Sequence, residues 1–185
     1  MVNNITNTSI SPSSPVTDIR KMVYASLFAA LTAIGAYITI PLGPIPFTLQ
    51  VVFVLLAGAM LGSKWGAISM IVYTFLGIAG LPVFSGGASG IGVILGPTGG
   101  YIIGFIAAAF VVGFLFEKNR SEKVLFNAIY VLMGSVVIYA FGLTHLMLVA
   151  DMSFMQAITV GFLPFIGGAL VKIAVAAYIA TTYKI

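Results

Sequence analysis

The sequence predicts an all-α integral membrane protein, a six-transmembrane-helix bundle with both termini cytoplasmic. Hydrophobic residues make up 61% of the chain and charged residues only 6%, whereas about a quarter of the residues in an average soluble domain are charged. The 185 residues leave room for about six helices of about 20 residues each. The basic residues lie at the ends of apolar segments, a pattern typical of membrane topology and not of a nucleic-acid-binding surface.

The N-terminal segment, residues 1–17, is polar and rich in Ser, Thr and Asn. Because it has no apolar core, we expect a disordered tail. It also lacks the short apolar stretch, preceded by basic residues, that marks a signal peptide. We expect the rest of the chain, residues 18–185, to form a single membrane domain.

The first apolar run, residues 22–40, is long enough to span the bilayer. Ala25, Ala29 and Ala33 recur in it every four residues and therefore share one face of a helix. A stripe of small residues lets another helix approach closely. Its partner is either another helix of the same bundle or a second protein.

Three prolines between Pro41 and Phe47 end this first span. We expect the second span to run over residues 48–61, with the Thr48 hydroxyl capping its first turn. Gln50 then lies inside the span, where an amide is costly unless it meets a polar partner. Gln50 therefore either bonds a neighbouring helix or faces a ligand.

The remaining spans are predicted from the apolar runs that follow. A short connection with Lys64 and Trp65 leads into the third span, and Trp65 is typical of an anchor at the membrane surface. Tyr139, in the fifth span, either packs in the core or faces a ligand. The third to sixth spans are expected at residues 67–78, 99–116, 124–143 and 162–182.

About a third of residues 77–105 are glycine, and this stretch also contains Pro82 and Pro97. Such a segment cannot face lipid, because its backbone amides and carbonyls would have no hydrogen-bond partners there. Glycine also lets the backbone approach a ligand closely. The segment is either a flexible connector or the wall or lid of a binding site, and we favour the second interpretation.

Residues 144–161 form a second irregular region, with a short helix expected near 152–160. It contains His145 and Asp151. No Cys, Asp or Glu stands at metal-ligand spacing from His145, so we expect a solvated loop histidine and no metal site. Cysteine is absent from the chain, which excludes disulfides and thiolate chemistry.

The orientation follows from the basic residues. With six spans, the outward loops contain no Lys or Arg, and the positive-inside rule places both termini in the cytoplasm. The basic residues on the cytoplasmic side are Arg20, Lys21, Lys64, Lys118, Arg120, Lys123 and Lys184.

Lys172 is the remaining basic residue, and it lies eight positions after Pro164 in the last apolar run. At the rise of a helix, this places it roughly 12 Å from the outer end of the span. A lysine inside a membrane is expensive and marks a functional site whose partner has to be found. The candidate partners are Asp151 and an anionic substrate.

Four segments of the chain form a distinctive set of motifs: PIPFTLQVVFVLLAGAMLG (44–62), GLPVFSGG (80–87), GPTGGYIIGF (96–105) and PFIGGALVK (164–172). Together they resemble the BioY family, the biotin-specific substrate-binding (S) components of energy-coupling factor (ECF) transporters. The similarity extends from Met22 to the C-terminus, and one position differs: Ala169 stands where members usually carry an aspartate.

This resemblance implies a six-helix protein that captures biotin from outside, in the plasma membrane of a prokaryote. It implies docking through the stripe of Ala25, Ala29 and Ala33 on a transmembrane coupling subunit driven by two ABC ATPases. This chain has no Walker-type phosphate loop, so ATP would be used by the partners only. No cofactor is expected.

The expected ligand site combines apolar walls with a few polar groups. Phe47, Phe84 and Val93 suit the thiophane ring and valeryl chain of biotin. Lys172 is the candidate for its carboxylate, and the candidates for its ureido group are Thr48, Gln50, Tyr139 and Asp151. The glycine-rich motifs add Ser85, Gly86, Gly99 and Tyr101.

Two other classes of function fit the sequence less well. A self-sufficient facilitator needs a continuous polar lining, and the spans offer few polar residues for one. A membrane enzyme needs a catalytic constellation, and one histidine with four acidic residues is a poor basis for it. The same scaffold with another small anionic vitamin in its pocket remains an alternative.

Overall fold

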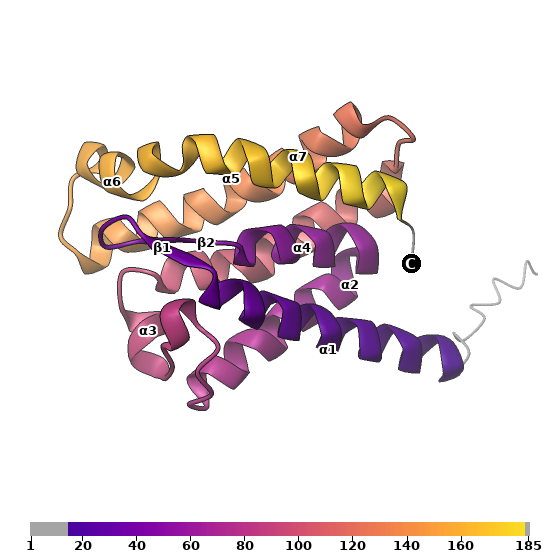
Figure 1. Cartoon of the computed structure of the whole chain (residues 1–185), viewed down its shortest axis with the longest axis horizontal. Helices are drawn as coiled ribbons and strands as arrows, with labels where there is room; N and C mark the ends of the chain where they lie inside the picture. Colours follow the sequence, from indigo (N-terminus) through magenta and orange to yellow (C-terminus); the bar gives the residue numbers. More distant parts are fainter. Residues whose placement is uncertain (1–14, 184–185) are drawn as a thin grey trace, which may run out of the picture.

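The computed structural model describes residues 15–183, which form a bundle of helices with a β-hairpin at one end (Figure 1). The hairpin and the short helix α3 were not predicted. Most of the tail predicted for residues 1–17 lies outside the described part of the chain. Its last three residues, Pro15–Thr17, belong to α1. The elements are α1 (Pro15–Tyr37), β1 (Thr39–Pro41), β2 (Pro46–Thr48), α2 (Gln50–Ile78), α3 (Ile91–Leu95), α4 (Gly99–Asn119), α5 (Val124–Val149), α6 (Phe154–Gly161) and α7 (Ile166–Thr182), with single 3₁₀ turns at Ser85–Gly87 and Leu163–Phe165.

Five helical segments of the described chain are long and apolar enough to cross a membrane. This confirms a mostly helical chain with several candidate membrane spans. The five segments are Asp18–Tyr37, Gln50–Ile78, Gly99–Asn119, Val124–Val149 and Phe154–Thr182, the last of which joins α6 to α7.

The long helix α2 reverses direction at Gly62. In a straight helix, residues eight positions apart are about 12 Å apart, but a Cβ on Gly66 would lie only 2.8 Å from the Cα of Gly58. Gly62 has φ 81°, a conformation that glycine adopts without steric cost. Glu117 supports the reversal, because its carboxylate accepts hydrogen bonds from the Ser63 amide (2.9 Å) and hydroxyl (2.8 Å). The second and third predicted spans are therefore the two arms of α2.

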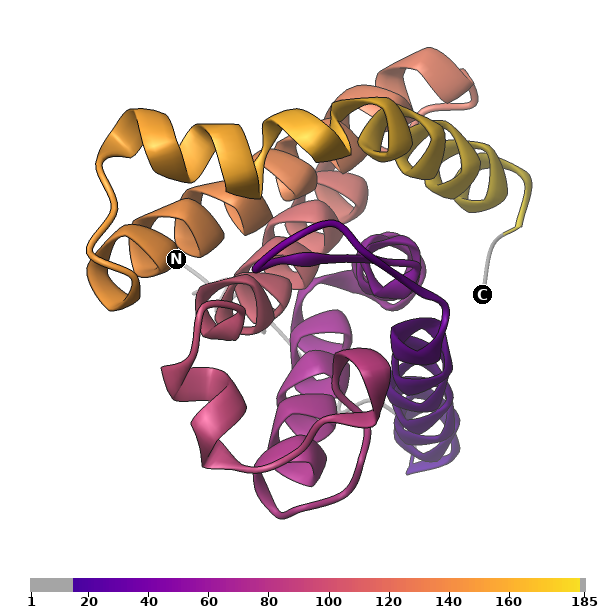
Figure 2. The same ribbon diagram turned by 60° about the vertical axis from the view of Figure 1, so that its left-hand side comes forward.

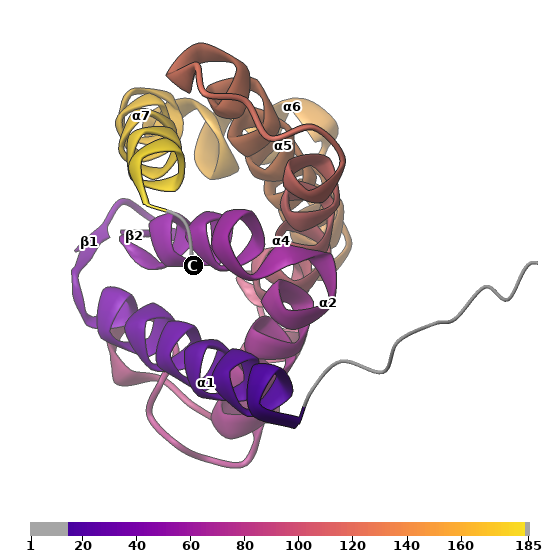
Figure 3. The same ribbon diagram turned by 90° about the vertical axis from the view of Figure 1, so that its right-hand side faces the viewer.

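The helix α4 packs against both α2 and α5, and α7 packs against α5. Figure 3 shows α1 at one edge of the bundle, α5 and α7 at the other, and α4 between them. Small residues allow the close approach: Gly58 of α2 lies directly against the Ala109 backbone of α4, and Gly104 of α4 lies against Ile138 of α5. Close backbone packing of this kind holds helices together in lipid.

The alanine stripe of α1 is part of this internal packing. Ala25 and Ala29 are only 4% and 3% exposed, and the Ser69 hydroxyl of α2 donates a 2.6 Å hydrogen bond to the Ala25 carbonyl. Ala33 is half-buried. The expectation that this stripe is a free docking face is therefore wrong for Ala25 and Ala29, because α2 already covers them.

The two ends of the bundle differ in composition. One end holds the β-hairpin, α3 and α6; the other holds the beginning of α1, the α4–α5 connection and the C-terminus (Figure 1). At this second end, Arg120 donates hydrogen bonds to the carbonyls of Ala180 and Tyr183, which places a cation at the carboxyl end of α7. The described basic residues other than Lys172 belong to this end, and Lys184 lies outside the described residues.

Candidate functional site

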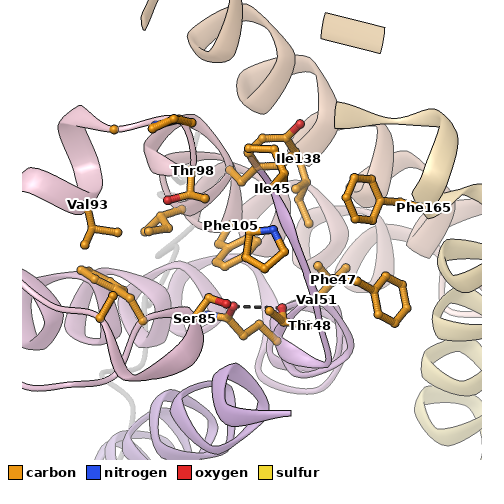
Figure 4. A pocket seen from close by; sticks show the side chains of 18 of the residues that line it. Ile45, Phe47, Thr48, Val51, Ser85, Val93, Thr98, Phe105, Ile138 and Phe165 are labelled. Carbon is orange, nitrogen blue, oxygen red and sulfur yellow. Dashed lines mark hydrogen bonds between the residues drawn. The ribbon is translucent and has the colours of Figure 1, made fainter. Parts of the chain in front are cut away.

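A cavity of about 460 Å³ lies at the hairpin end of the bundle. Its walls come from α2, α4, α5 and α7, and it is covered by the β-hairpin and by residues 84–98. Figure 4 shows Phe47 and Phe165 at one side of this cavity, with Thr98 and Val93 at the opposite side. Its volume is in the range of small-molecule binding sites.

Lys172 is the one charged residue of the described chain that lines the cavity. Its side chain is 7% exposed, and its Nζ lies 3.5 Å from the centroid of the Phe47 ring. No Asp or Glu is among the lining residues, and the position one turn earlier on α7 is Ala169. The cavity therefore offers a buried cation that has no carboxylate partner in its walls.

Gln50 begins α2 at the wall of the cavity and is held by hydrogen bonds on both sides. Its Oε1 accepts a 2.9 Å bond from the Thr48 hydroxyl, and its Nε2 donates to the hydroxyl of Tyr73. The Tyr73 hydroxyl donates in turn to the Val83 carbonyl at 3.0 Å. The network thus joins the hairpin, both arms of α2 and the loop after α2. Its hydrogen bonds offset the free-energy cost of burying the Gln50 amide.

Residues 79–98 cross this end of the bundle beside the hairpin (Figure 2) and are anchored by Phe84. The Phe84 ring is fully buried and meets Tyr73 edge to face at 5.7 Å. Gly77 makes room for it, because a Cβ there would collide with the Phe84 ring. The Gly77 carbonyl also accepts a 2.7 Å bond from the Gly90 amide. The predicted wall of a binding site is thus a packed segment and not a loose connector.

Further hydrogen bonds tie this segment to α1, the hairpin and α5. Tyr37 donates to the Pro82 carbonyl, and the hydroxyls of Thr39 and Ser85 are 3.2 Å apart. The Nε2 of His145 lies 3.1 Å from the Gly96 carbonyl. A carbonyl only accepts, so this nitrogen carries the proton.

His145 was predicted in a solvated loop, and this prediction is wrong. The helix α5 continues to Val149, six residues beyond the predicted end, and His145 is half-buried in its last turns. Gly100 of α4 lies directly against the His145 side chain. The histidine therefore packs between two helices and supports the cavity wall at Gly96.

Aromatic residues close the cavity toward α6. Tyr139 meets Tyr101 edge to face at 6.3 Å and Phe162 at 4.9 Å. The Tyr101 hydroxyl donates a 2.9 Å bond to the carbonyl of Gly161, the last residue of α6. Tyr101 therefore has a structural partner as well as a place in the cavity wall.

Most of the predicted ligand residues meet at this cavity. Asp151, Gly86 and Gly99 do not line it. Asp151 is exposed in the turn after α5, with φ 49°, and Gly86 is exposed with φ 67°. Gly99 is buried against the backbone of Ile94 at the start of α4. The predicted residues that line the cavity are Phe47, Thr48, Gln50, Phe84, Ser85, Val93, Tyr101, Tyr139 and Lys172.

Several lining residues were missed by the sequence analysis. Ser135 is a hydroxyl within an apolar helix, and that contrast is the signal that would have identified it. The apolar residues have no such signal, because every face of a membrane helix is apolar. The missed residues include Ile45, Val51, Ser89, Thr98, Ile102, Phe105, Ser135, Ile138 and Phe165.

The chain is similar to known transport proteins along nearly its whole length. The model of the BioY family matches residues 6–185. The Biotin transporter BioY of Thermotoga maritima is 46% identical over 169 residues, covering 89% of this chain and 96% of the relative. The Biotin transporter BioY of Rhizobium etli is 40% identical over 168 residues, with 85% and 89% covered.

A solved structure has the same fold. It is the crystal structure of the S-component for biotin from an ECF-type ABC transporter, which superimposes with a TM-score of 0.86 at 28% identity and covers 92% of this chain and 94% of that one. The family is one of transporters and not of enzymes. On the family match, the identities and the shared fold, this chain belongs to the BioY family.

Proposed function

We propose that this protein is the biotin-binding S component of an ECF-type ABC transporter. It captures biotin from outside the cell, and partner subunits drive uptake with ATP. The relatives named above are biotin transporters, and the solved structure with the same fold is an S-component for biotin.

The observation that carries this proposal is the buried Lys172 in an otherwise uncharged cavity. Biotin has an apolar ring system and chain with a carboxylate at one end and a ureido group at the other. The aromatic and aliphatic walls suit the apolar part. Lys172 suits the carboxylate, because a charge-assisted hydrogen bond in a desolvated site is short and strong. The hydroxyl oxygens of Thr48, Ser85 and Thr98 in the lining can accept hydrogen bonds from the N–H groups of the ureido ring, while the Thr48 hydroxyl continues to donate its proton to Gln50.

The proposed topology has six spans, with the two arms of α2 crossing separately and both termini in the cytoplasm. The basic end of the bundle then faces the cytoplasm, as the positive-inside rule requires, and the cavity opens outward. We place the protein in the plasma membrane of a prokaryote, in line with the bacterial sources of the relatives named above. The partners are a transmembrane coupling subunit and two ABC ATPases, which the family resemblance implies.

The first experiment is to purify the protein in detergent, identify any small molecule that co-purifies, and titrate biotin by calorimetry. Saturable binding of biotin at one site per chain is expected. Binding of a different anionic vitamin in preference to biotin would retain the scaffold and the cation but overturn the assignment of the ligand.

Replacing Lys172 with Met tests the role of the buried cation, since Met retains the apolar stem and removes the charge. Breaking a desolvated charge pair costs about 2 to 5 kcal/mol, roughly 30-fold to several-thousand-fold in affinity. Lys172→Met should weaken biotin by this order. Lys64→Met, at the opposite end of the bundle, is the matched control and should leave binding unchanged.

Biotin amide separates the carboxylate contact from general damage. The amide should bind the native protein more weakly than biotin but lose little further affinity in the Lys172→Met variant, because two changes that remove one contact do not add. Equal binding of acid and amide to the native protein, or losses that simply sum, would show that Lys172 does not hold the carboxylate.

A further inference from the structure

The Phe47 ring occupies an unusual position between the β-hairpin and α7. It stacks on Phe165 with the rings parallel (2°) and their centroids 6.2 Å apart. Its edge lies against Gly168, where a Cβ would collide with the ring. Its face lies 3.5 Å from the Nζ of Lys172. One hairpin residue therefore contacts α7 and its preceding turn at three points.

The contact with Lys172 is the one that matters for charge. The ammonium is almost fully buried, and the lining of the cavity contains no carboxylate. An aromatic face attracts a cation, and the attraction is stronger when both groups are desolvated. Within the described lining of the cavity, the Lys172 ammonium thus faces the Phe47 ring and not a carboxylate counter-ion.

We infer that Phe47 is a positioning residue for Lys172: its ring holds the ammonium at the cavity wall and links anion binding to the seating of the hairpin. This inference rests on the proposed function of the cavity as a site for an anionic ligand. It assigns to Phe47 a role beyond that of an apolar wall.

The geometry leaves the ammonium free to bind an anion. The ring covers one side of Nζ, whereas a lysine ammonium has three N–H donors. Without the ring, the flexible stem of Lys172 is free to turn away from the cavity. The observed affinity for an anion then falls in proportion to the fraction of molecules in which the lysine is correctly placed.

The Phe47 ring belongs to the β-hairpin, so the ring contacts Lys172 only when the hairpin is seated against α7. Phe47 pairs with Ile40 across the hairpin, and the neighbouring Thr48 is fixed by its bond to Gln50. On the other strand, Thr39 lies within hydrogen-bond distance of Ser85. A hairpin displaced from this position removes the ring from Lys172, and an anion that favours the held lysine therefore favours the closed hairpin.

The first test needs no ligand. Thermal unfolding in detergent is measured for the native protein, Phe47→Leu, Lys172→Met and the double variant. Phe47→Leu should lower the unfolding temperature more in the native background than in the Lys172→Met background, because the ring has no charge to hold in the latter. Equal shifts in the two backgrounds would overturn the inference. Phe47→Tyr keeps an aromatic face but adds a hydroxyl at the ring edge that meets Gly168, so it should lower the unfolding temperature in both backgrounds and still retain most of the native coupling.

The second test compares ligands. Phe47→Leu should weaken biotin by about 3- to 30-fold, the range that corresponds to a partly to fully desolvated cation–π contact, and should weaken biotin amide clearly less. Phe47→Tyr should restore most of the preference for the acid. Equal losses for acid and amide would show that Phe47 is only a wall. If the native protein binds no biotin, the proposed function fails, whereas the unfolding cycle still decides whether Phe47 holds Lys172.

Discussion

At the residue scale, the hydroxyl of Tyr73 holds the polar network beside the cavity together. It accepts from the Gln50 amide and donates to the Val83 carbonyl, and its side chain is fully buried. Few other groups are available in this apolar surrounding to replace a lost partner. A buried polar atom left without its hydrogen bond costs more than the bond itself contributes.

Tyr73→Phe removes this hydroxyl and leaves the ring in place. It should destabilise the protein by about 1–3 kcal/mol, the cost of leaving buried polar groups unsatisfied. Backbone exchange at residues 82–90 should become faster, because Val83 loses its anchor. Tyr178→Phe, on an exposed side chain, is the matched control. If both variants unfold at the native temperature, the network does not hold this segment.

At this scale, sequence reasoning selected residues that are costly to bury in their surroundings. Gln50 and Lys172 stand out in apolar helices, and both line the cavity. Asp151 was selected because it is the one acid among the outward loops, but its position is set by a turn whose direction the sequence does not reveal. The helix α7 contains no Asp or Glu, so Lys172 has no acidic neighbour on its own helix.

At the scale of elements, α1 carries alanines at every fourth position, a repeat that can pack against a helix of the same bundle or against a second protein. Alanines at every fourth position predict close helix packing, but they do not say which helix is packed. The structure places Ala25 and Ala29 against α2. The neighbouring Ala30 is exposed, so two adjacent alanines of one helix have opposite surroundings.

Ala29→Leu should therefore act on folding. An enlarged side chain in a packed interface costs about 1–3 kcal/mol, so the variant should unfold at a lower temperature and lose ligand binding in parallel. Ala30→Leu is matched in chemistry and in helix position and should leave both quantities unchanged in the isolated protein. If the two variants behave alike, α1 does not pack against α2 as described.

Helix ends and short elements were the least predictable. The prolines of 41–47 correctly predicted a break, but the antiparallel pairing of Ile40 with Phe47 depends on contacts with α7 and Ser85 that are distant in sequence. The helix α5 extends past Leu143, and His145 in this extension donates to the Gly96 carbonyl. Gly96 lies in the glycine-rich segment, and the glycine content of that segment does not determine the path of its backbone.

At the scale of the whole molecule, the distribution of charge was readable from the sequence because lipid excludes charges. The described basic residues other than Lys172 belong to the start of α1, the reversal of α2 and the α4–α5 connection. The hairpin and the glycine-rich segment lie at the opposite end of the bundle (Figure 1). The number of membrane crossings does not follow as directly from the sequence. Residues 50–61 rise only about 18 Å as a helix, against a hydrocarbon core of about 30 Å, and the hairpin continues this arm toward the outer end.

The number of crossings decides the sidedness of the two ends, and the absence of cysteine from the chain makes this testable with single introduced cysteines. Ile19→Cys and Tyr183→Cys report on the two ends of the described chain, since both side chains are 61% exposed. Leu42→Cys reports on the hairpin. Lys64→Cys reports on the reversal of α2 after Gly62.

Six crossings predict that a membrane-impermeant thiol reagent, added to intact cells, labels Leu42→Cys but not Ile19→Cys, Lys64→Cys or Tyr183→Cys. Opening the cells should make all three of these accessible. If α2 crossed only once, the number of crossings would be odd and the two terminal cysteines would react from opposite sides. Lys64→Cys would then lie within the membrane and react from neither side. The reversal at Gly62 adds one crossing, so both termini lie on the same side of the membrane only if α2 reverses there.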